Sequence, residues 1–244
     1  MQLTVPARRW NSALLPALVA VAGLLSACGD ETAKSTPTAT TVPATPTVAF
    51  DVSVPTEIDI GTGPALVWGT GRYGVVLVHG AIYDAASWTE QAAAIAAAGF
   101  AVVAIENATA ADTRAATDYL GRTFGVEAVG LVGASAGTGP VLDAASAHPP
   151  DSRPAIDLVV ILAGSGNVDQ LDVASVLFIS AEGDGAAAAA KRMLAATSGA
   201  PADLLLVPGS AHAQALFNEP EGEQVLSTIV ERLTERQRAL TTEP

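Results

Sequence analysis

The segment Gly133-Ala134-Ser135-Ala136-Gly137 constrains the fold more than any other part of this chain. An apolar run at residues 126–132 precedes it, and an Ala-rich segment with helical spacing, 136–147, follows it. Small residues let a strand turn sharply into a helix, and they leave a central serine standing on the turn beside free backbone N–H groups. Because G-x-S-x-G alone is common in a glycine-rich chain, the weight of the motif comes from this strand–turn–helix context.

Apolar runs alternate with Ala-rich helical segments along most of the remaining sequence. Uninterrupted apolar strands separated by helices are typical of a parallel sheet that is buried on both faces. Strands are expected at residues 74–78, 100–105, 126–132, 156–162, 173–180 and 204–207, and helices at 85–98, 109–124, 136–147, 186–197 and 221–240. Residues 51–68 are expected to add one or two antiparallel edge strands. We therefore predict an α/β fold with a mostly parallel central sheet and helices on both faces.

The first 27 residues are predicted to be a targeting segment that is not part of the fold. Arg8 and Arg9 precede an apolar stretch at 13–25, which is shorter than the ~20 residues that a membrane-spanning helix needs. The stretch ends in Leu25-Ser26-Ala27-Cys28, which resembles a bacterial lipoprotein signal. That resemblance implies export and a membrane anchor through a lipid on Cys28. The alternative is an ordinary signal peptide followed by an incidental cysteine.

Composition divides the rest of the chain into a tether and one domain. Residues 28–50 are rich in Thr, Pro, Ala and Ser, so they hold too little apolar surface to repay the entropy of folding. We predict a disordered tether there and a single catalytic domain at 51–244. Cys28 is the only cysteine, which rules out a disulfide within the chain.

The charge of the chain limits its partners. The formal net charge is −13, and loss of residues 1–27, with two arginines and no acidic residue, leaves about −15. Nucleic-acid binding requires a basic patch, so nucleic acid is not expected as a partner. Electrostatic adhesion to anionic lipid is disfavoured for the same reason, which leaves the lipid anchor as the expected membrane contact. The sequence leaves the oligomeric state open.

Four places in the sequence together resemble the α/β-hydrolase superfamily, in its serine esterase and lipase branch. Ser135 occupies the position of the nucleophile in that family's G-x-S-x-G turn. His212, in the loop after the last expected strand, matches the catalytic histidine, a side chain that can take up and return a proton near neutral pH. Asp184, after the strand at 173–180, matches the acid that orients the histidine, with Glu182 as the reserve candidate. A solvated charge or a helix cap is the alternative role for Asp184.

The fourth place is His79-Gly80-Ala81, directly after the strand at 74–78. It resembles the family's loop whose backbone N–H groups bind the oxyanion of the transition state. The resemblance implies donors on Ala81 and Ala136, with Ile82 as a substitute for Ala81, and a bracing role for His79. His148, before two prolines at a helix end, is interpreted as structural.

These parts imply acyl transfer to water, with a small-molecule ester as substrate and with no cofactor and no metal. Only ten residues, 163–172, lie between two expected strands where relatives insert a cap, so a minimal domain resembling dienelactone hydrolases and carboxylesterases is expected. The chain has three histidines and no H-E-x-x-H spacing, which disfavours metal-assisted hydrolysis. The main alternative is a catalytically silent binding lipoprotein with the same fold.

Overall fold

The computed structural model describes residues 50–242. The predicted signal segment at 1–27, Cys28 and all of the predicted tether except Phe50 lie outside the described residues. Within the described part, no helix combines the length and the apolar character that crossing a membrane requires.

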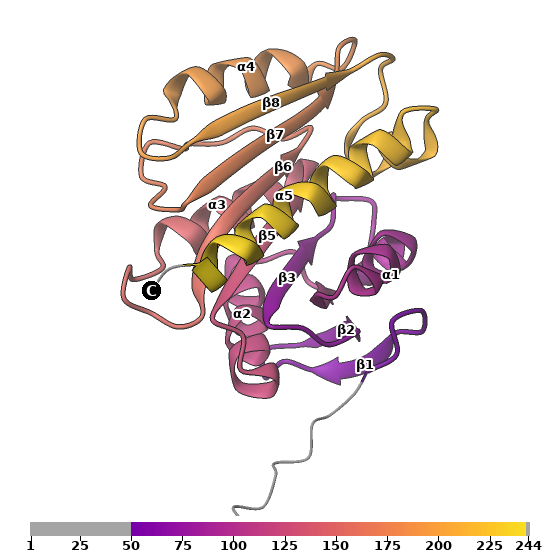
Figure 1. The fold of residues 1–244 in the computed structure, drawn as a ribbon. Helices are drawn as coiled ribbons and strands as arrows, with labels where there is room; N and C mark the ends of the chain where they lie inside the picture. The colour runs from indigo at the N-terminus through magenta and orange to yellow at the C-terminus, as the bar shows by residue number, and fades with distance from the viewer. Residues whose placement is uncertain (1–49, 243–244) are drawn as a thin grey trace, which may run out of the picture. The chain divides into compact units, whose positions relative to one another are not determined.

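The described residues form one eight-stranded sheet in the order β1-β2-β4-β3-β5-β6-β7-β8 (Figure 1). Strands β3 to β8 run parallel, while β2 pairs antiparallel with both β1 and β4. The strands are β1 (Thr56–Asp59), β2 (Pro64–Trp68), β3 (Tyr73–Val78), β4 (Ala101–Ile105), β5 (Ala128–Ala134), β6 (Ala155–Leu162), β7 (Ser175–Ala181) and β8 (Ala202–Val207). The predicted mostly parallel sheet and its antiparallel edge are confirmed.

Helices cover both faces of the sheet, as predicted (Figure 1). Helices α1 (Thr89–Ala97) and α5 (Gly222–Thr242) lie on one face. The other face carries α2 (Ala110–Phe124), α3 (Thr138–Ser146) and α4 (Ala186–Ala196). The first expected helix begins with a short 3-10 turn, η1 (Ala85–Trp88), which the Asp84 side chain caps by accepting a hydrogen bond from the Ser87 N–H.

Local capping groups set the bounds of α2. The Thr109 hydroxyl accepts a hydrogen bond from the Asp112 N–H at 3.0 Å, which satisfies one of the free donors at the helix start. Gly125 ends the helix in the left-handed region, with φ at 65°, a conformation that glycine adopts without a steric penalty. Both signals are local, and the predicted range 109–124 accordingly differs from the observed helix by one residue.

The apolar runs that predicted the central strands are buried on both of their sides. Every residue of β3, β4, β5 and β7 is buried. The layer under α1 and α5 is rich in large aromatic side chains, among them Trp68, Tyr73, Trp88 and Phe100. The layer under α2, α3 and α4 is mainly aliphatic. The loops at the carboxyl edge of the sheet therefore start from strands that are packed on both faces.

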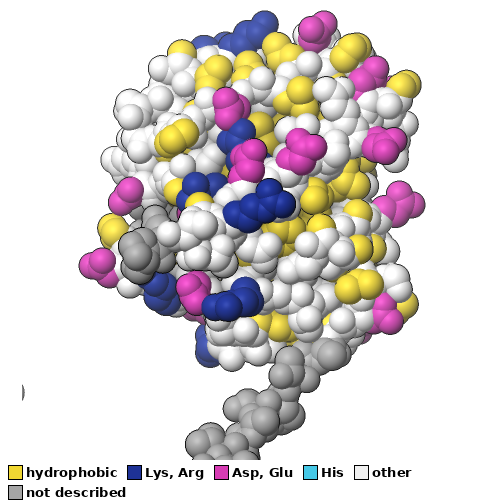
Figure 2. Space-filling view, in the orientation of Figure 1, with side chains coloured by type: hydrophobic (Ala, Val, Ile, Leu, Met, Phe, Trp, Pro, Cys, Tyr) yellow, Lys and Arg dark blue, Asp and Glu magenta, His cyan; other side chains and the backbone are white. Residues whose placement is uncertain are grey.

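A buried polar cluster fixes α5 to the sheet. Arg236 on α5 donates two hydrogen bonds to the Asp157 carboxylate on β6, both at 2.9 Å, and the Tyr73 hydroxyl on β3 donates a third at 3.1 Å. Burial raises the pKa of Tyr73 well above its ordinary value of 10.0; the charge and hydrogen bond of Asp157 raise it further, and Arg236 partly opposes them. The surface over α5 carries acidic and basic side chains intermingled (Figure 2).

The strand order reverses at β3. From β3 the chain crosses over α1 to β4 on one side, and it then returns over α2 to β5 on the other side of β3. In open α/β sheets, ligands bind outside the carboxyl ends of the strands at such a reversal. The segment 163–174 between β6 and β7 contains no helix or strand, so no cap domain covers this edge within the described residues.

Candidate active site

Ser135 follows β5 immediately and stands on a strained turn. Its φ is 48°, in the left-handed region, which costs a non-glycine residue on the order of 1–3 kcal/mol. The 3-10 turn η2 (Ser135–Gly137) then leads directly into α3. This is the sharp strand-to-helix turn that the sequence predicted, and it leaves Ser135 partly exposed at the carboxyl edge of the sheet.

Gly133 and Gly137 of the motif lie where the neighbouring backbone leaves no room for a side chain. Gly137 has φ −68° and ψ −12°, a conformation open to any residue, but a Cβ there would lie 2.5 Å from the Val78 carbonyl oxygen. A Cβ on Gly133 would lie 2.8 Å from the carbonyl oxygen of Gly137. The backbone of the turn therefore packs directly against itself and against the end of β3.

A chain of hydrogen bonds joins the three side chains that the sequence selected. His212 Nε2 lies 2.8 Å from Ser135 Oγ, and His212 Nδ1 lies 2.7 Å from Asp184 Oδ2. An ionised carboxylate only accepts hydrogen bonds, so Nδ1 carries the proton and Nε2 is left to accept from the serine hydroxyl. The residues come from the ends of β5, β7 and β8, and they meet across 77 and 28 positions of sequence.

Asp184 contacts His212 and also the backbone at the start of α4, although the N-cap position of that helix is Gly185. Its Oδ2 meets His212, while its Oδ1 accepts a hydrogen bond from the Ala186 N–H at 3.2 Å, at the start of α4. The Asp184 side chain is 10% exposed, whereas the His212 side chain is 51% exposed. Glu182, the reserve candidate, lies exposed on the same loop, and among the described residues Asp184 is the carboxylate hydrogen-bonded to His212.

The loop after β3 is held at several points. His79 is buried, with Nδ1 at 2.8 Å from the Gly80 carbonyl oxygen and Nε2 at 2.9 Å from the Glu106 carbonyl oxygen. Both partners are carbonyl oxygens, which only accept, so the ring nitrogen that carries the proton donates to one of them, and the buried ring braces the loop. The Gly80 N–H donates to the Gln214 side chain, and the Tyr83 N–H donates to the Gly80 carbonyl.

These bonds bear on the predicted oxyanion donors. With the N–H groups of Gly80 and Tyr83 engaged inside the protein, Ala81 and Ile82 are the loop positions between them, and both are exposed. Ala136 follows Ser135 directly and is also exposed, at the start of the turn. The assignment of the donors to Ala81 and Ala136, with Ile82 as substitute, stays a prediction.

Left-handed backbone at non-glycine residues is concentrated at this edge of the sheet. Besides Ser135, Ala163 after β6 has φ 48°, and Ala213 next to His212 has φ 54°. Strained residues of this kind persist only where their surroundings fix them, and they cluster at functional sites. None of the three follows the usual sequence signal for such a turn, which is glycine or asparagine.

An open cavity of about 660 Å³ contains Ser135 and His212. Its wall is made mostly of small residues: Ala136, Gly139, Ala163, Gly164, Ser165, Gly185, Ala186 and Ala189. Among the described residues that line it, Arg192 on α4 is the one with a permanent charge. Because the lining side chains are small, the cavity is wide and open, and Arg192 places one positive charge in its wall.

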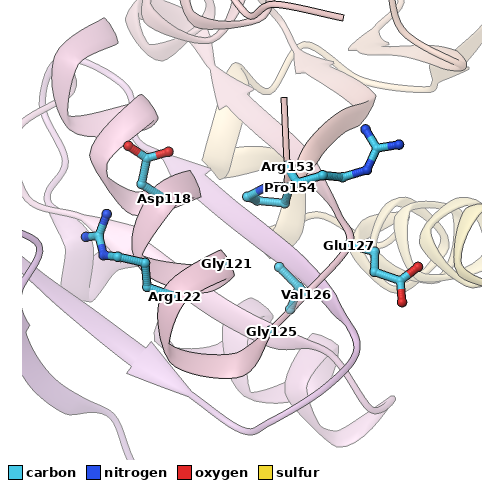
Figure 3. A pocket seen from close by; sticks show the side chains of 8 residues that line it. All are labelled: Asp118, Gly121, Arg122, Gly125, Val126, Glu127, Arg153 and Pro154. Atoms are coloured by element: carbon cyan, nitrogen blue, oxygen red, sulfur yellow. The ribbon is translucent and has the colours of Figure 1, made fainter. Parts of the chain in front are cut away.

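A second cavity, of about 560 Å³, lies at the opposite edge of the sheet, where β5 and β6 begin. Asp118 and Arg122 on α2 line it together with Glu127, Arg153 and Pro154. Figure 3 shows that the charged groups of these side chains point in different directions and do not converge. It brings together no nucleophile and base, so it does not compete with the site around Ser135.

The described residues form no metal site, and the third histidine, His148, has a structural role. Within residues 50–242, no group of three or more His, Cys, Asp or Glu side chains is placed to hold a metal ion. His148 lies after α3 with Nε2 3.0 Å from the Pro154 carbonyl oxygen, which is a structural contact remote from Ser135 in the fold.

The sequence did not single out Gln214, whose two hydrogen bonds reach positions 134 and 127 residues away.

Comparison with known proteins gives similarity in structure alone. No model of a known protein family matches the sequence, and no curated protein sequence matches it. Among solved structures, an esterase from the bacterial hormone-sensitive lipase family is similar, with a TM-score of 0.63 at 18% identity over 78% of this chain and 86% of that one. A monoacylglycerol lipase from Paleococcus ferrophilus aligns with a TM-score of 0.60 at 16% identity, over 70% of this chain and 98% of that one.

A dienelactone hydrolase from Anabaena variabilis aligns with a TM-score of 0.55 at 19% identity, over 75% of this chain and 95% of that one. Identities this low establish the fold and leave the activity to be argued from the site. Together with the sheet order, they show that residues 50–242 have the α/β-hydrolase fold.

Proposed function

We propose that this chain is a serine hydrolase that cleaves carboxylic esters through an acyl-enzyme, with Ser135, His212 and Asp184 as the catalytic triad. The observation that carries the proposal is the hydrogen-bond chain from Ser135 Oγ through the His212 ring to Asp184, with distances of 2.8 and 2.7 Å. A nucleophile, a base and a group that orients the base are the minimum that this chemistry needs.

The reaction follows from the positions of the protons. Ser135 Oγ attacks the ester carbonyl carbon while its proton moves to His212 Nε2, and the carbonyl oxygen becomes an oxyanion. The intermediate collapses, His212 gives the proton to the departing alkoxide, and the acyl group stays on Ser135. Water then enters the open cavity, loses a proton to His212 and attacks the acyl carbonyl. Release of the acid returns the proton to Ser135 Oγ.

The neighbours of the triad support each step. Asp184 holds the Nδ1–H tautomer of His212 and stabilises the imidazolium that forms during the reaction. Backbone N–H groups of Ala81 and Ala136 are proposed to bind the oxyanion, and each donor of this kind contributes about 3–4 kcal/mol to lowering the barrier. The half-exposed His212 ring is accessible to the water that deacylation consumes.

The shape of the site supports a small or exposed ester as substrate. The cavity wall consists mainly of glycine, alanine and serine, and no cap covers it within residues 50–242. A deep apolar slot for a long acyl chain would need larger side chains than these. The similar proteins named above include an esterase and a lipase, which makes ester hydrolysis a reasonable first assay.

Fluorophosphonate labelling tests the nucleophile. A fluorophosphonate probe should label the wild-type protein, and Ser135→Ala should abolish the adduct while retaining the fold. Asp184→Asn and His212→Ala should each lower kcat for a p-nitrophenyl ester by roughly 10³-fold or more with little loss of stability. Absence of labelling and of turnover in the wild type would favour the alternative, a catalytically silent binding protein with this fold.

The lipoprotein signal is part of the same proposal. Its residues, including Cys28, lie outside the described part of the chain, so the proposal rests on the sequence Leu25-Ser26-Ala27-Cys28. In a bacterial host, the full chain should incorporate an alkyne fatty acid and sediment with membranes. Cys28→Ser should lose the label and leave the membrane fraction, and a labelled Cys28→Ser variant would refute the assignment.

A further inference from the structure

Gln214 lies two residues after His212, in the 3-10 turn η3 (Ala213–Asn218), and its side chain is buried. Its Oε1 accepts a hydrogen bond from the Gly80 N–H at 2.9 Å, and its Nε2 donates to Ser87 Oγ at 2.6 Å. Gly80 belongs to the loop after β3, and Ser87 belongs to η1. One amide therefore joins the loop of the proposed base to the loop of the proposed oxyanion donors.

The direction of each hydrogen bond fixes the orientation of this amide. The Ser87 hydroxyl donates its single proton to the Asp84 carbonyl oxygen, so it can only accept from Gln214. The Gly80 N–H can only donate, so the amide oxygen must face it. A side chain at 214 must therefore present an acceptor and a donor at the same time, at the length of a glutamine.

The backbone beside Gln214 also depends on it. Ala213 is buried and has φ 54°, a left-handed conformation that alanine adopts only when its surroundings hold it there. This turn lets His212 face Ser135 while Gln214, the next residue but one, faces the interior. The two hydrogen bonds of Gln214 lie on the inner side of this strained turn.

We propose that Gln214 is a positioning residue that sets the loop at 79–82 against His212, so that the base and the oxyanion donors keep one geometry. The inference rests on the proposed function. The Gly80 N–H is oriented into the protein by Gln214, and the following N–H groups, of Ala81 and Ile82, are thereby presented at the site. Binding of the substrate ground state does not depend on these donors, whereas the transition state does.

Gln214→Met tests the inference, because methionine has a similar length and makes neither hydrogen bond. Packing between the same two turns remains, since the Trp88 and Phe217 rings meet edge to face at 6.0 Å, so the variant is expected to fold. We expect kcat for a p-nitrophenyl ester to fall about 10- to 100-fold, with KM changed less than about threefold, because donors displaced by up to about 1 Å stabilise the transition state poorly.

Two further measurements separate positioning from a general structural effect. Affinity for a boronic acid, which forms a tetrahedral adduct on the serine, should fall in parallel with kcat/KM. Gln224→Met, the same substitution at an exposed position of α5, is the matched control and should leave kcat and KM unchanged. If Gln214→Met does not fold, Ser87→Ala replaces it: the amide loses its outer partner, and kcat should fall about three- to tenfold at constant KM.

The outcomes distinguish the two proposals. A wild-type protein that neither hydrolyses the ester nor reacts with a fluorophosphonate overturns the proposed function and this inference together. An active wild type with a folded Gln214→Met variant of unchanged kcat overturns the inference alone. A rise in KM at constant kcat also overturns it, because Gln214 would then act on substrate binding.

Discussion

Replacing Gly137 with alanine should disturb the junction between the turn at Ser135 and the end of β3. The new Cβ would lie 2.5 Å from the Val78 carbonyl oxygen and 2.7 Å from the His79 carbonyl oxygen. Real Cβ atoms essentially never approach other heavy atoms closer than 3.0 Å, so the two backbone segments must separate by at least about 0.5 Å. Both obstacles are backbone atoms at the end of a central strand, and neither can rotate away as a side chain would.

The size of the effect follows from this displacement. Overpacking of a tightly packed interior costs about 1–3 kcal/mol. In a domain of this size each kcal/mol lowers Tm by about 2–4 °C, so Tm should fall by about 2–12 °C. The displaced carbonyls adjoin the loop that begins at His79, and kcat/KM should fall at least about tenfold, since a 1 Å misplacement can cost 100-fold.

Gly139→Ala is the matched control for stability. Gly139 lies two residues further along, within α3, and a Cβ there meets nothing within 4 Å. Alanine is favoured over glycine inside a helix by about 1 kcal/mol, so this variant should unfold at a slightly higher temperature than the wild type. Thermal unfolding followed by circular dichroism compares all three proteins, and p-nitrophenyl ester hydrolysis follows Gly137→Ala.

The opposite pattern would refute the reasoning. If Gly137→Ala unfolds at the wild-type temperature and retains wild-type kcat/KM, the backbone contacts around this glycine are not as tight as the structure has them. If Gly139→Ala loses as much stability as Gly137→Ala, then the loss follows from removing any glycine near Ser135, and the contact with Val78 does not explain it.

Three other predictions concern charged and polar groups. The pKa of Tyr73 is raised in the folded state, so the stability that the neutral phenol contributes is complete below pH 10. It is lost as the pH rises above about 10, by up to about 1.4 kcal/mol per pH unit. Tyr73→Phe should therefore show a flatter decline in Tm between pH 9 and 11. Asp157→Asn should lower the free energy of unfolding by about 2–4 kcal/mol, because it removes the buried carboxylate that binds Arg236 with both oxygens. Asp203→Asn, where the carboxylate is 63% exposed, should cost less than about 1 kcal/mol. Arg192→Gln should lower kcat/KM about fivefold for the 4-nitrophenyl monoester of succinic acid relative to 4-nitrophenyl butyrate, since an exposed ion pair contributes up to about 1 kcal/mol.

Each of these has a result that contradicts it. Equal alkaline slopes for the wild type and Tyr73→Phe would show that the buried phenol does not govern the loss of stability. Equal losses in Asp157→Asn and Asp203→Asn, measured by urea unfolding, would show that burial of the ion pair has no effect. An Arg192→Gln variant that treats the anionic and neutral esters as the wild type does would remove Arg192 from substrate recognition.

The elements that the sequence predicted well are those whose signals are local. The apolar runs at 74–78, 100–105 and 156–162 coincide with strands to within a residue or two, because a strand buried on both faces must be apolar throughout. The turn at Ser135 was also predictable, since small residues between a strand and a helix leave the chain few alternatives. Ser135, Asp184 and His212 each follow an expected parallel strand, so the sequence also predicted that all three lie at the carboxyl edge of the sheet.

The features that the sequence did not predict depend on distant partners. Asp157 lies inside an apolar run, and nothing near it in sequence reveals Tyr73, 84 positions before it, or Arg236, 79 positions after it. Ala163 and Ala213 adopt left-handed backbone without the glycine or asparagine that usually signals it, because tertiary contacts override local preference there. Gln214 belongs to the same class, since its partners become neighbours only when the sheet has formed.

Asp184 shows why two local interpretations need not compete. The sequence offered a partner for the histidine, a solvated charge or a helix cap, and a bond to the histidine and a bond to the helix start each need only one carboxylate oxygen. In the structure, Oδ1 accepts from the Ala186 N–H and Oδ2 meets His212 Nδ1. The N–H at the start of α4 therefore orients the carboxylate, and this orientation directs the second oxygen at the imidazole. The backbone at the start of α4, a helix that begins with five alanines, thus fixes the orientation in which Asp184 meets His212.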